Sequence, residues 1–223
     1  MRRNPSAAFT LLEMMTVIAV IVILTGLVLN LAGFAQRKGA LARATGEIQM
    51  LMSACESYKS DNGNYPRDRQ ANSTSSATDN LSPKQNFSPN GKDFQLYASA
   101  SLFLYKQLSG DLDANGVPDQ GVPRYFKDLD LRILNATKNA NNVISQVNYL
   151  QDPFGFSYGY STAAAAAEES FQSDVLQGKR SPTRRTGNAL PGFNINSFDL
   201  WSTSGSTGTK TPDLEWAQWA KNW

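Results

Sequence analysis

Residues 8–24 read AFTLLEMMTVIAVIVIL and open a long apolar run. A short basic leader carrying Arg2 and Arg3 precedes it, and residues 14–35 contain no charged side chain. About 22 such residues are enough for a helix that crosses the ~30 Å hydrocarbon core of a membrane. The sequence therefore predicts a membrane-spanning helix over residues 9–35, with the basic leader on the cytoplasmic side.

Glu13 is an acid just inside the apolar boundary, and its presence needs a reason. A carboxylate in hydrocarbon is costly, so acids retained there usually have a function. A secretory signal peptide has a shorter apolar core that is followed by small residues, whereas Ala7 and Ala8 come before this core. A plain signal anchor explains the length and the leader but gives Glu13 no role.

The string Ala8-Phe9-Thr10-Leu11-Leu12-Glu13 resembles the processing site of type IV pilins and type II secretion pseudopilins. The resemblance implies that a prepilin peptidase removes the leader, residues 1–8, by cutting between Ala8 and Phe9, and methylates the new amino group of Phe9. Ala8 stands where the family usually has glycine. Once the cut is made, the Phe9 amine of an incoming subunit can pair with Glu13 of a neighbour and set the stagger of a helical filament.

The composition excludes several classes of function. The 223 residues include no histidine and a single cysteine, Cys55. This excludes Ser-His-Asp and Cys-His catalysis, His-ligated metals, internal disulfides and cysteine metal clusters. Without Arg2 and Arg3 the net side-chain charge is 2 − 2 = 0, so we expect no specific nucleic-acid partner. Nothing favours an enzyme or an organic cofactor.

Apolar residues continue past residue 35 at spacings of three and four, which is typical of one face of an amphipathic helix. The positions are Leu41, Ala44, Ile48, Leu51, Cys55 and Tyr58. No proline interrupts residues 9–60, so the sequence predicts one helix of about 50 residues whose second half, 36–60, packs under a head with Cys55 buried. Residues 58–66 (YKSDNGNYP) end the helix and resemble the YKxDNGxYP segment of major pseudopilins.

Residues 61–223 are expected to form a globular head, which gives an α+β fold with a short antiparallel sheet, as the pilin resemblance implies. Residues 67–92 are rich in Ser, Asn, Thr and Pro and predict a solvated loop, inserted relative to the family. The remaining predicted segments are helices at 94–108 and 163–176, a turn entering a strand at 152–160, a basic loop at 178–191, a strand at 193–202 and a tail at 214–223 packed on the head. Residues 125–149 fit no single pattern.

Residues 111–119 (DLDANGVPD) have the spacing of the front of a calcium loop. Asp111, Asp113, Asn115 and Asp119 take the first, third, fifth and ninth positions, and Gly116 takes the sixth, where the chain turns sharply. The twelfth position, which normally supplies a bidentate acid, is Val122; Asp128 or Asp130 could complete the shell. The alternative is a turn rich in Asp and Asn that binds nothing.

Two later segments also resemble major pseudopilins. Residues 152–160 (DPFGFSYGY) resemble the family's DPWGxxYxY segment, and residues 199–202 (DLWS) resemble its DLxS strand. The family follows that strand with a calcium loop rich in Gly and Asp. The corresponding stretch here, residues 203–213, holds one acid, Asp213, so this site is only weakly indicated.

These observations predict a structural subunit of a pseudopilus that drives type II secretion. Its expected partners are copies of itself in a helical filament, the bacterial inner membrane, the prepilin peptidase and the assembly platform of the secretion system. The head is expected in the periplasm. The alternatives are a type IV pilin for adhesion, motility or DNA uptake, and a membrane-anchored binding domain that does not polymerise.

Overall fold

The computed structural model describes residues 10–68, 77–126, 130–182, 190–206 and 208–223, without the side chains of residues 27–32. The chain divides into two compact units, Met1–Ala40 and Leu41–Trp223. The predicted cleavage site between Ala8 and Phe9 lies outside the described residues.

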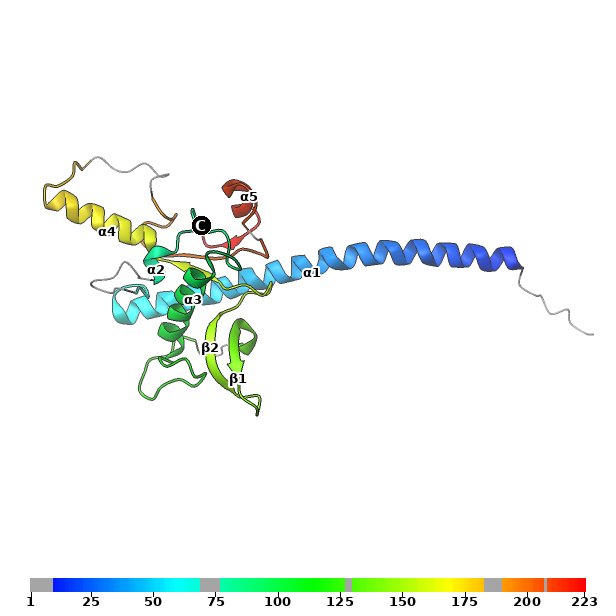
Figure 1. The fold of residues 1–223 in the computed structure, drawn as a ribbon, viewed down its shortest axis with the longest axis horizontal. Helices are drawn as coiled ribbons and strands as arrows, with labels where there is room; N and C mark the ends of the chain where they lie inside the picture. Colours follow the sequence, from blue (N-terminus) through cyan, green and yellow to red (C-terminus); the bar gives the residue numbers. More distant parts are fainter. Residues whose placement is uncertain (1–9, 69–76, 127–129, 183–189, 207) are drawn as a thin grey trace, which may run out of the picture. The chain divides into compact units, whose positions relative to one another are not determined.

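One helix, α1 (Leu11–Asn62), accounts for 52 residues at the N-terminal end (Figure 1). It confirms the prediction of a single helix that continues from the apolar stretch into the amphipathic one. The helix ends at Gly63, which has a left-handed φ of 76° and donates its N–H to the Lys59 carbonyl at 2.7 Å. Glycine adopts this conformation without strain, so the Asn-Gly pair stops the helix where the sequence indicated.

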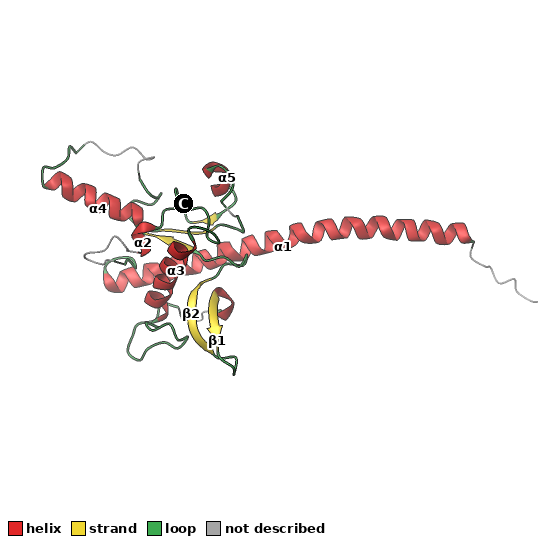
Figure 2. Ribbon diagram, in the orientation of Figure 1, coloured by secondary structure: helices red, strands yellow, loops and turns green. Residues whose placement is uncertain are grey.

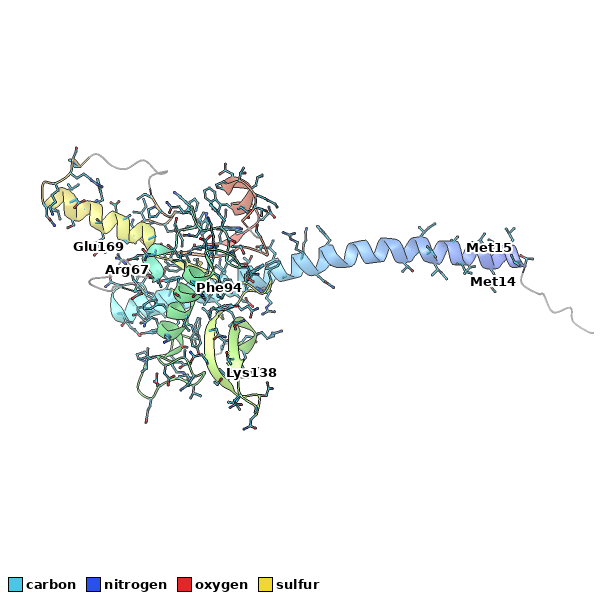
Figure 3. All side chains as sticks on the ribbon, in the orientation of Figure 1. Met14, Met15, Arg67, Phe94, Lys138 and Glu169 are labelled. Atoms are coloured by element: carbon cyan, nitrogen blue, oxygen red, sulfur yellow. The ribbon has the colours of Figure 1, made fainter. Side chains whose placement is uncertain are left out.

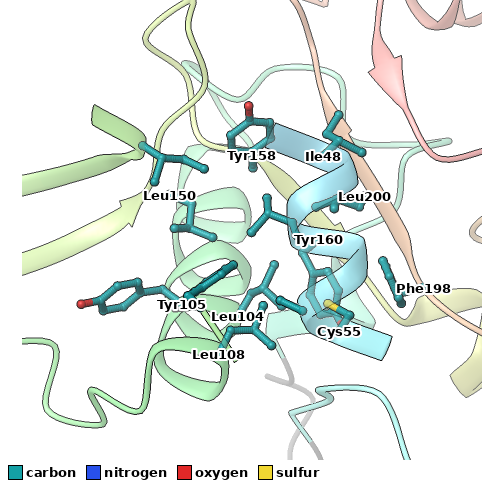
Figure 4. Packing of buried hydrophobic residues seen from close by; sticks show 14 of the residues in the cluster. Ile48, Cys55, Leu104, Tyr105, Leu108, Leu150, Tyr158, Tyr160, Phe198 and Leu200 are labelled. Atoms are coloured by element: carbon teal, nitrogen blue, oxygen red, sulfur yellow. The ribbon is translucent and has the colours of Figure 1, made fainter. Parts of the chain in front are cut away.

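The core of the second unit is built around the amphipathic end of α1 (Figure 4). Ala44, Ile48, Leu51 and Cys55 are at most 1% exposed, whereas Leu41 of the same stripe remains 37% exposed. Their partners are Leu104, Leu108, Leu150, Tyr158, Tyr160, Phe198 and Leu200, among others. Each fully buried Leu or Ile contributes roughly 1.5–3 kcal/mol, so this face holds the end of α1 in the head.

Two further helices match their predictions closely. Helix α3 (Phe94–Ser109) buries Tyr97, Leu104, Tyr105 and Leu108, and Gly110 ends it with φ of 72°. Helix α4 (Ala163–Leu176) has the predicted bounds, with Ala163, Ala164 and Phe171 as its buried side chains. The apolar face of residues 94–108 was sufficient to find α3, whereas α4 was expected to be exposed and instead buries these three side chains.

The strands form two small antiparallel sheets, drawn in yellow in Figure 2. Strands β1 (Leu134–Lys138) and β2 (Ile144–Leu150) make a hairpin within the region that showed no clear pattern, just after the short 3-10 helix η1 (Leu131–Ile133). The second sheet has the order β3-β4-β5, with β3 (Gly159–Ser161), β4 (Asp199–Ser202) and β5 (Ala220–Lys221). The short helix α5 (Pro212–Trp216) precedes β5.

The prediction of a strand over residues 193–202 was wrong for its first six residues. Within this range only β4 pairs with other strands. All four of its residues are buried, whereas the prediction expected buried and exposed residues to alternate. The N–H groups of Phe193 and Asn194 donate instead to the Asp199 carboxylate, each at 2.9 Å. Because these two N–H groups bond to a side chain, they are not available for hydrogen bonds to a neighbouring strand.

The prediction of a solvated loop over residues 67–92 was wrong for its second half. Helix α2 (Ala77–Asn80) and the residues after it bury Thr78, Leu81 and Ser82. Backbone carbonyls of this segment accept hydrogen bonds from distant side chains: Asn86 from the Tyr97 hydroxyl at 2.8 Å and Pro83 from Trp216 Nε1 at 2.8 Å. Side chains elsewhere in the chain therefore supply hydrogen bonds to the backbone of this polar segment, which allows it to be buried.

Candidate functional sites: an assembly segment and a metal loop

The first candidate site is the apolar beginning of α1, in the first unit. Its large side chains are exposed, for example Leu11 at 79%, Met15 at 61% and Ile23 at 64%; Met14 and Met15 are labelled in Figure 3. Contiguous apolar surface of this kind marks contact with lipid or with other protein chains. Within the part of the chain that the structure describes, no helix is long and apolar enough to cross a membrane.

Glu13 is held by Thr10 in a capping box at the start of α1. The Thr10 N–H and the Thr10 hydroxyl both donate to Glu13 Oε2, at 2.8 Å and 2.9 Å, and the Glu13 N–H donates to Thr10 Oγ1 at 3.2 Å. This role was not predicted from the sequence, although the T-x-x-E spacing signals it. Both contacts use Oε2, and no described residue donates to Oε1, so one carboxylate oxygen remains available.

The second candidate site is the loop after α3. One carboxylate oxygen from each of Asp111, Asp113 and Asp119 lies within 4.8 Å of the others. Asp111 is buried, Asp119 is partly buried and Asp113 is exposed, so the loop can present three oxygens to a cation at the surface. Among the described residues, no other set of three potential ligands of the His, Cys, Asp or Glu type converges in this way.

Hydrogen bonds from protein groups fix Asp111 in place. Its carboxylate accepts from the Tyr105 hydroxyl at 2.6 Å and from the N–H groups of Asn115 and Gly116 at 3.1 Å and 2.8 Å. Burial, followed by the bond to Asp111, raises the pKa of Tyr105, so the phenol stays a donor. Asp119 Oδ2 accepts from the Leu112 N–H at 2.8 Å, which draws the two ends of the loop together.

The other predicted ligands are arranged differently. The side-chain oxygen of Asn115 accepts from the Val117 N–H at 2.8 Å, while its amide nitrogen donates to Asp113 at 2.8 Å. Asp130 pairs with Arg132 at 2.7 Å, and the hydrogen bonds from Arg132 lower the pKa of Asp130 to about 2. Asp128 lies outside the described residues. The structure thus brings together the three aspartates and turns the Asn115 oxygen toward the backbone.

The loop is also fastened to the β1–β2 hairpin. The Val147 N–H donates to the Ala114 carbonyl at 2.7 Å. Gly116, with φ of 87°, lies so close to Ile144 that an added Cβ would come within 2.7 Å of its Cγ2 atom. Protein contacts therefore set the position of the loop before any cation is considered.

The two segments after Leu150 that resemble pseudopilins meet in the structure. The Ser202 hydroxyl donates to Asp152, which also accepts from the N–H groups of Phe154 and Phe156 at 3.0 Å and 2.8 Å. In the adjoining sheet Gly159 faces Trp201, and an added Cβ would lie 2.2 Å from the Trp201 ring. The aspartate turn and the glycine together allow β3 to pair with β4.

Asp213, the weakly indicated ligand, lies in the first turn of α5 and is exposed. It is not part of any converging set of acids among the described residues.

Comparison with known proteins gives the family. Residues 3–29 match the prokaryotic N-terminal methylation motif. Over 142 residues the chain is 30% identical to the type II secretion system core protein G of Klebsiella michiganensis, and the match covers 94% of that protein and 58% of this chain. The chain belongs to the pseudopilin family of core protein G. No solved structure matches it. Because the match covers 58% of this pseudopilin, a considerable part of its sequence lies outside the match.

Proposed function

We propose that this pseudopilin is a structural subunit of a pseudopilus, which assembles from the bacterial inner membrane and drives type II protein secretion. The similarity to core protein G over 94% of that protein carries the proposal. The methylation motif supports it, because the motif runs directly into an apolar helix whose side chains are exposed. The similarity to a pseudopilin also supports a structural and non-catalytic role.

The assembly route follows from the chemistry of the N-terminal end. The prepilin peptidase cuts between Ala8 and Phe9 and methylates the amine, and the apolar segment anchors the subunit in the inner membrane with its head in the periplasm. At the assembly platform the Phe9 amine of one copy meets Glu13 of another. The unoccupied Oε1 of Glu13 supports this pairing, because Thr10 can keep Oε2 and the helix cap while the amine binds.

The test is filament formation by the full-length chain, expressed with a prepilin peptidase and a type II secretion system that lacks its own major pseudopilin. We expect periplasmic or surface filaments that contain this chain, together with restored secretion. Filaments that restore twitching or DNA uptake instead would assign it to type IV pili. A processed chain that stays monomeric in the membrane would indicate an anchored binding domain.

We also propose that the loop holding Asp111, Asp113 and Asp119 binds calcium. Three carboxylate oxygens that converge on one point suit a hard divalent cation, and oxygen ligands select calcium over softer metals. When bound, the cation would neutralise the charge of the three carboxylates, while Tyr105 and Gly116 hold Asp111 in place. The affinity is expected to be in the range of weaker extracellular sites, since the bidentate acid at the twelfth position is absent.

A further inference from the structure

Glu215 is a fully buried carboxylate in the second unit. It is 0% exposed, and no lysine or arginine among the described residues forms an ion pair with it. A buried charge is costly unless other groups compensate it. The compensation here comes from the described residues just before α5, 203–206 and 208–211, which we call the C-terminal loop.

Both oxygens of Glu215 accept hydrogen bonds from the C-terminal loop. The Ser206 hydroxyl donates to Oε2, and the Lys210 N–H donates to Oε1 at 2.8 Å. The Glu215 N–H in turn donates to the Thr211 carbonyl at 3.0 Å, which sets the first turn of α5. One side chain therefore ties together two points of the loop that are four residues apart.

The resemblance to major pseudopilins implies a calcium ion in this loop, and the residues present do not fit one. Calcium takes six to eight oxygen ligands, usually including several carboxylates. The stretch 203–213 offers one acid, Asp213, which is exposed, and neither Asp213 nor Glu215 belongs to a set of three converging acids among the described residues. Both oxygens of Glu215 accept from O–H and N–H donors of the protein itself. Those donors supply the positive partial charge that a bound cation would otherwise supply.

We propose that Glu215 closes the C-terminal loop in place of a metal ion. The closed loop lies against the segment that follows α2: Gly208 is so close to Phe87 that an added Cβ would come within 2.8 Å of the Phe87 carbonyl oxygen. Phe87 in turn packs on Trp216 and Trp219, with ring centroids 6.2 Å and 5.9 Å apart. Glu215 therefore holds the C-terminal loop against Phe87, Trp216 and Trp219 without calcium. This role does not depend on whether the chain polymerises.

Limited trypsin digestion of the full-length chain in detergent tests this closure, because Lys210 is itself a trypsin site. With its N–H bound to Glu215, the Lys210–Thr211 bond is protected in the wild type. Glu215→Gln replaces one accepting oxygen by an amide that faces a donor, so cleavage after Lys210 should be roughly tenfold faster. Cleavage after the exposed Arg180 should be unchanged and serves as the internal control.

The matched control variant is Asp213→Asn, an exposed acid two residues away on α5. It should leave cleavage after Lys210 unchanged, and a chelator should not accelerate that cleavage in the wild type. Ser206→Ala removes one donor and should open the loop part-way, which keeps the test decisive if Glu215→Gln does not fold. Equal protection in wild type, Glu215→Gln and Ser206→Ala would overturn the proposal.

The calcium dependence of melting separates this inference from the calcium loop at Asp111. In an Asp113→Asn background, which weakens that loop, the melting temperature should be the same in calcium and in chelator. A calcium-induced rise that persists there and disappears on adding Asp213→Asn or Glu215→Gln would show that the C-terminal loop binds the cation. That result would overturn the role of Glu215 while leaving the proposed pseudopilus untouched.

Discussion

Asp113→Asn is the sharpest test of calcium binding at the loop after α3. Asp113 is exposed, and among the described residues only Asn115 donates hydrogen bonds to its carboxylate, so an isosteric amide removes charge with little loss of packing. Asp111→Asn would be harder to interpret. It disturbs the buried bonds from Tyr105 and Gly116 and should cost about 1–3 kcal/mol even without metal.

The expected magnitude follows from linkage between binding and folding. At 10 mM calcium, a site with a dissociation constant of about 10⁻⁴ M is at roughly hundredfold excess and stabilises the folded head by about 2.7 kcal/mol. For a unit the size of Leu41–Trp223, each kcal/mol raises the melting temperature by roughly 2–4 °C. The wild type should therefore melt about 5–11 °C higher in calcium than in chelator.

The assay is thermal unfolding of the full-length chain in detergent, with calcium, with magnesium and with chelator. Asp113→Asn should melt near the wild type in chelator and lose most of the rise in calcium. Asp213→Asn should keep the whole rise. Equal melting temperatures of the wild type in calcium and in chelator, or a full calcium-induced rise in Asp113→Asn, would contradict calcium binding at this loop.

Three further predictions concern assembly, packing and pH. Glu13→Gln keeps the capping box, which accepts Glu or Gln, but removes the charge, so it should insert normally and fail to form filaments, and we expect the same of Glu13→Ala. If electron microscopy shows filaments of Glu13→Gln but none of Glu13→Ala, Glu13 acts only as a helix cap. Gly159→Ala should lower the free energy of unfolding by at least about 1–3 kcal/mol in chemical denaturation, because its Cβ would overlap the Trp201 ring; wild-type stability would contradict this. Burial raises the pKa of Asp199 above the unfolded value of 3.8, so its contribution to stability is complete below that pH and is lost as the pH rises through the folded pKa. As the pH rises from 3.8 through the folded pKa, the free energy of unfolding should fall less steeply for Asp199→Asn than for the wild type. Identical slopes would contradict a raised pKa of Asp199.

The sequence predicted the elements whose pattern is local. Helix α1 could be predicted because its apolar spacing is continuous and no proline interrupts it. Helix α3 followed from the same kind of apolar spacing, and the aspartate spacing located the convergence of Asp111, Asp113 and Asp119. In each case the residues that form the pattern lie close together along the chain.

The features that were missed depend on distant partners or on a single side chain. The segment around α2 looked solvated because the tryptophans that cover it lie more than a hundred residues later, as the bond from Trp216 to the Pro83 carbonyl shows. The strand prediction failed because Asp199 captures the N–H groups of Phe193 and Asn194. Glu215 carried no recognisable motif, since its role depends on a loop that is polar in sequence and closes only in three dimensions.

The mass of the N-terminal peptide, measured on the chain recovered from bacterial cells, shows whether the subunit is processed for assembly. We expect a mature chain that begins at Phe9 and carries one methyl group on its amino nitrogen. In cells that lack the prepilin peptidase, the same chain should keep residues 1–8. A chain that retains its leader in cells with the peptidase, or one that is cut beyond Ala35, would contradict a processed subunit that assembles through its N-terminal helix.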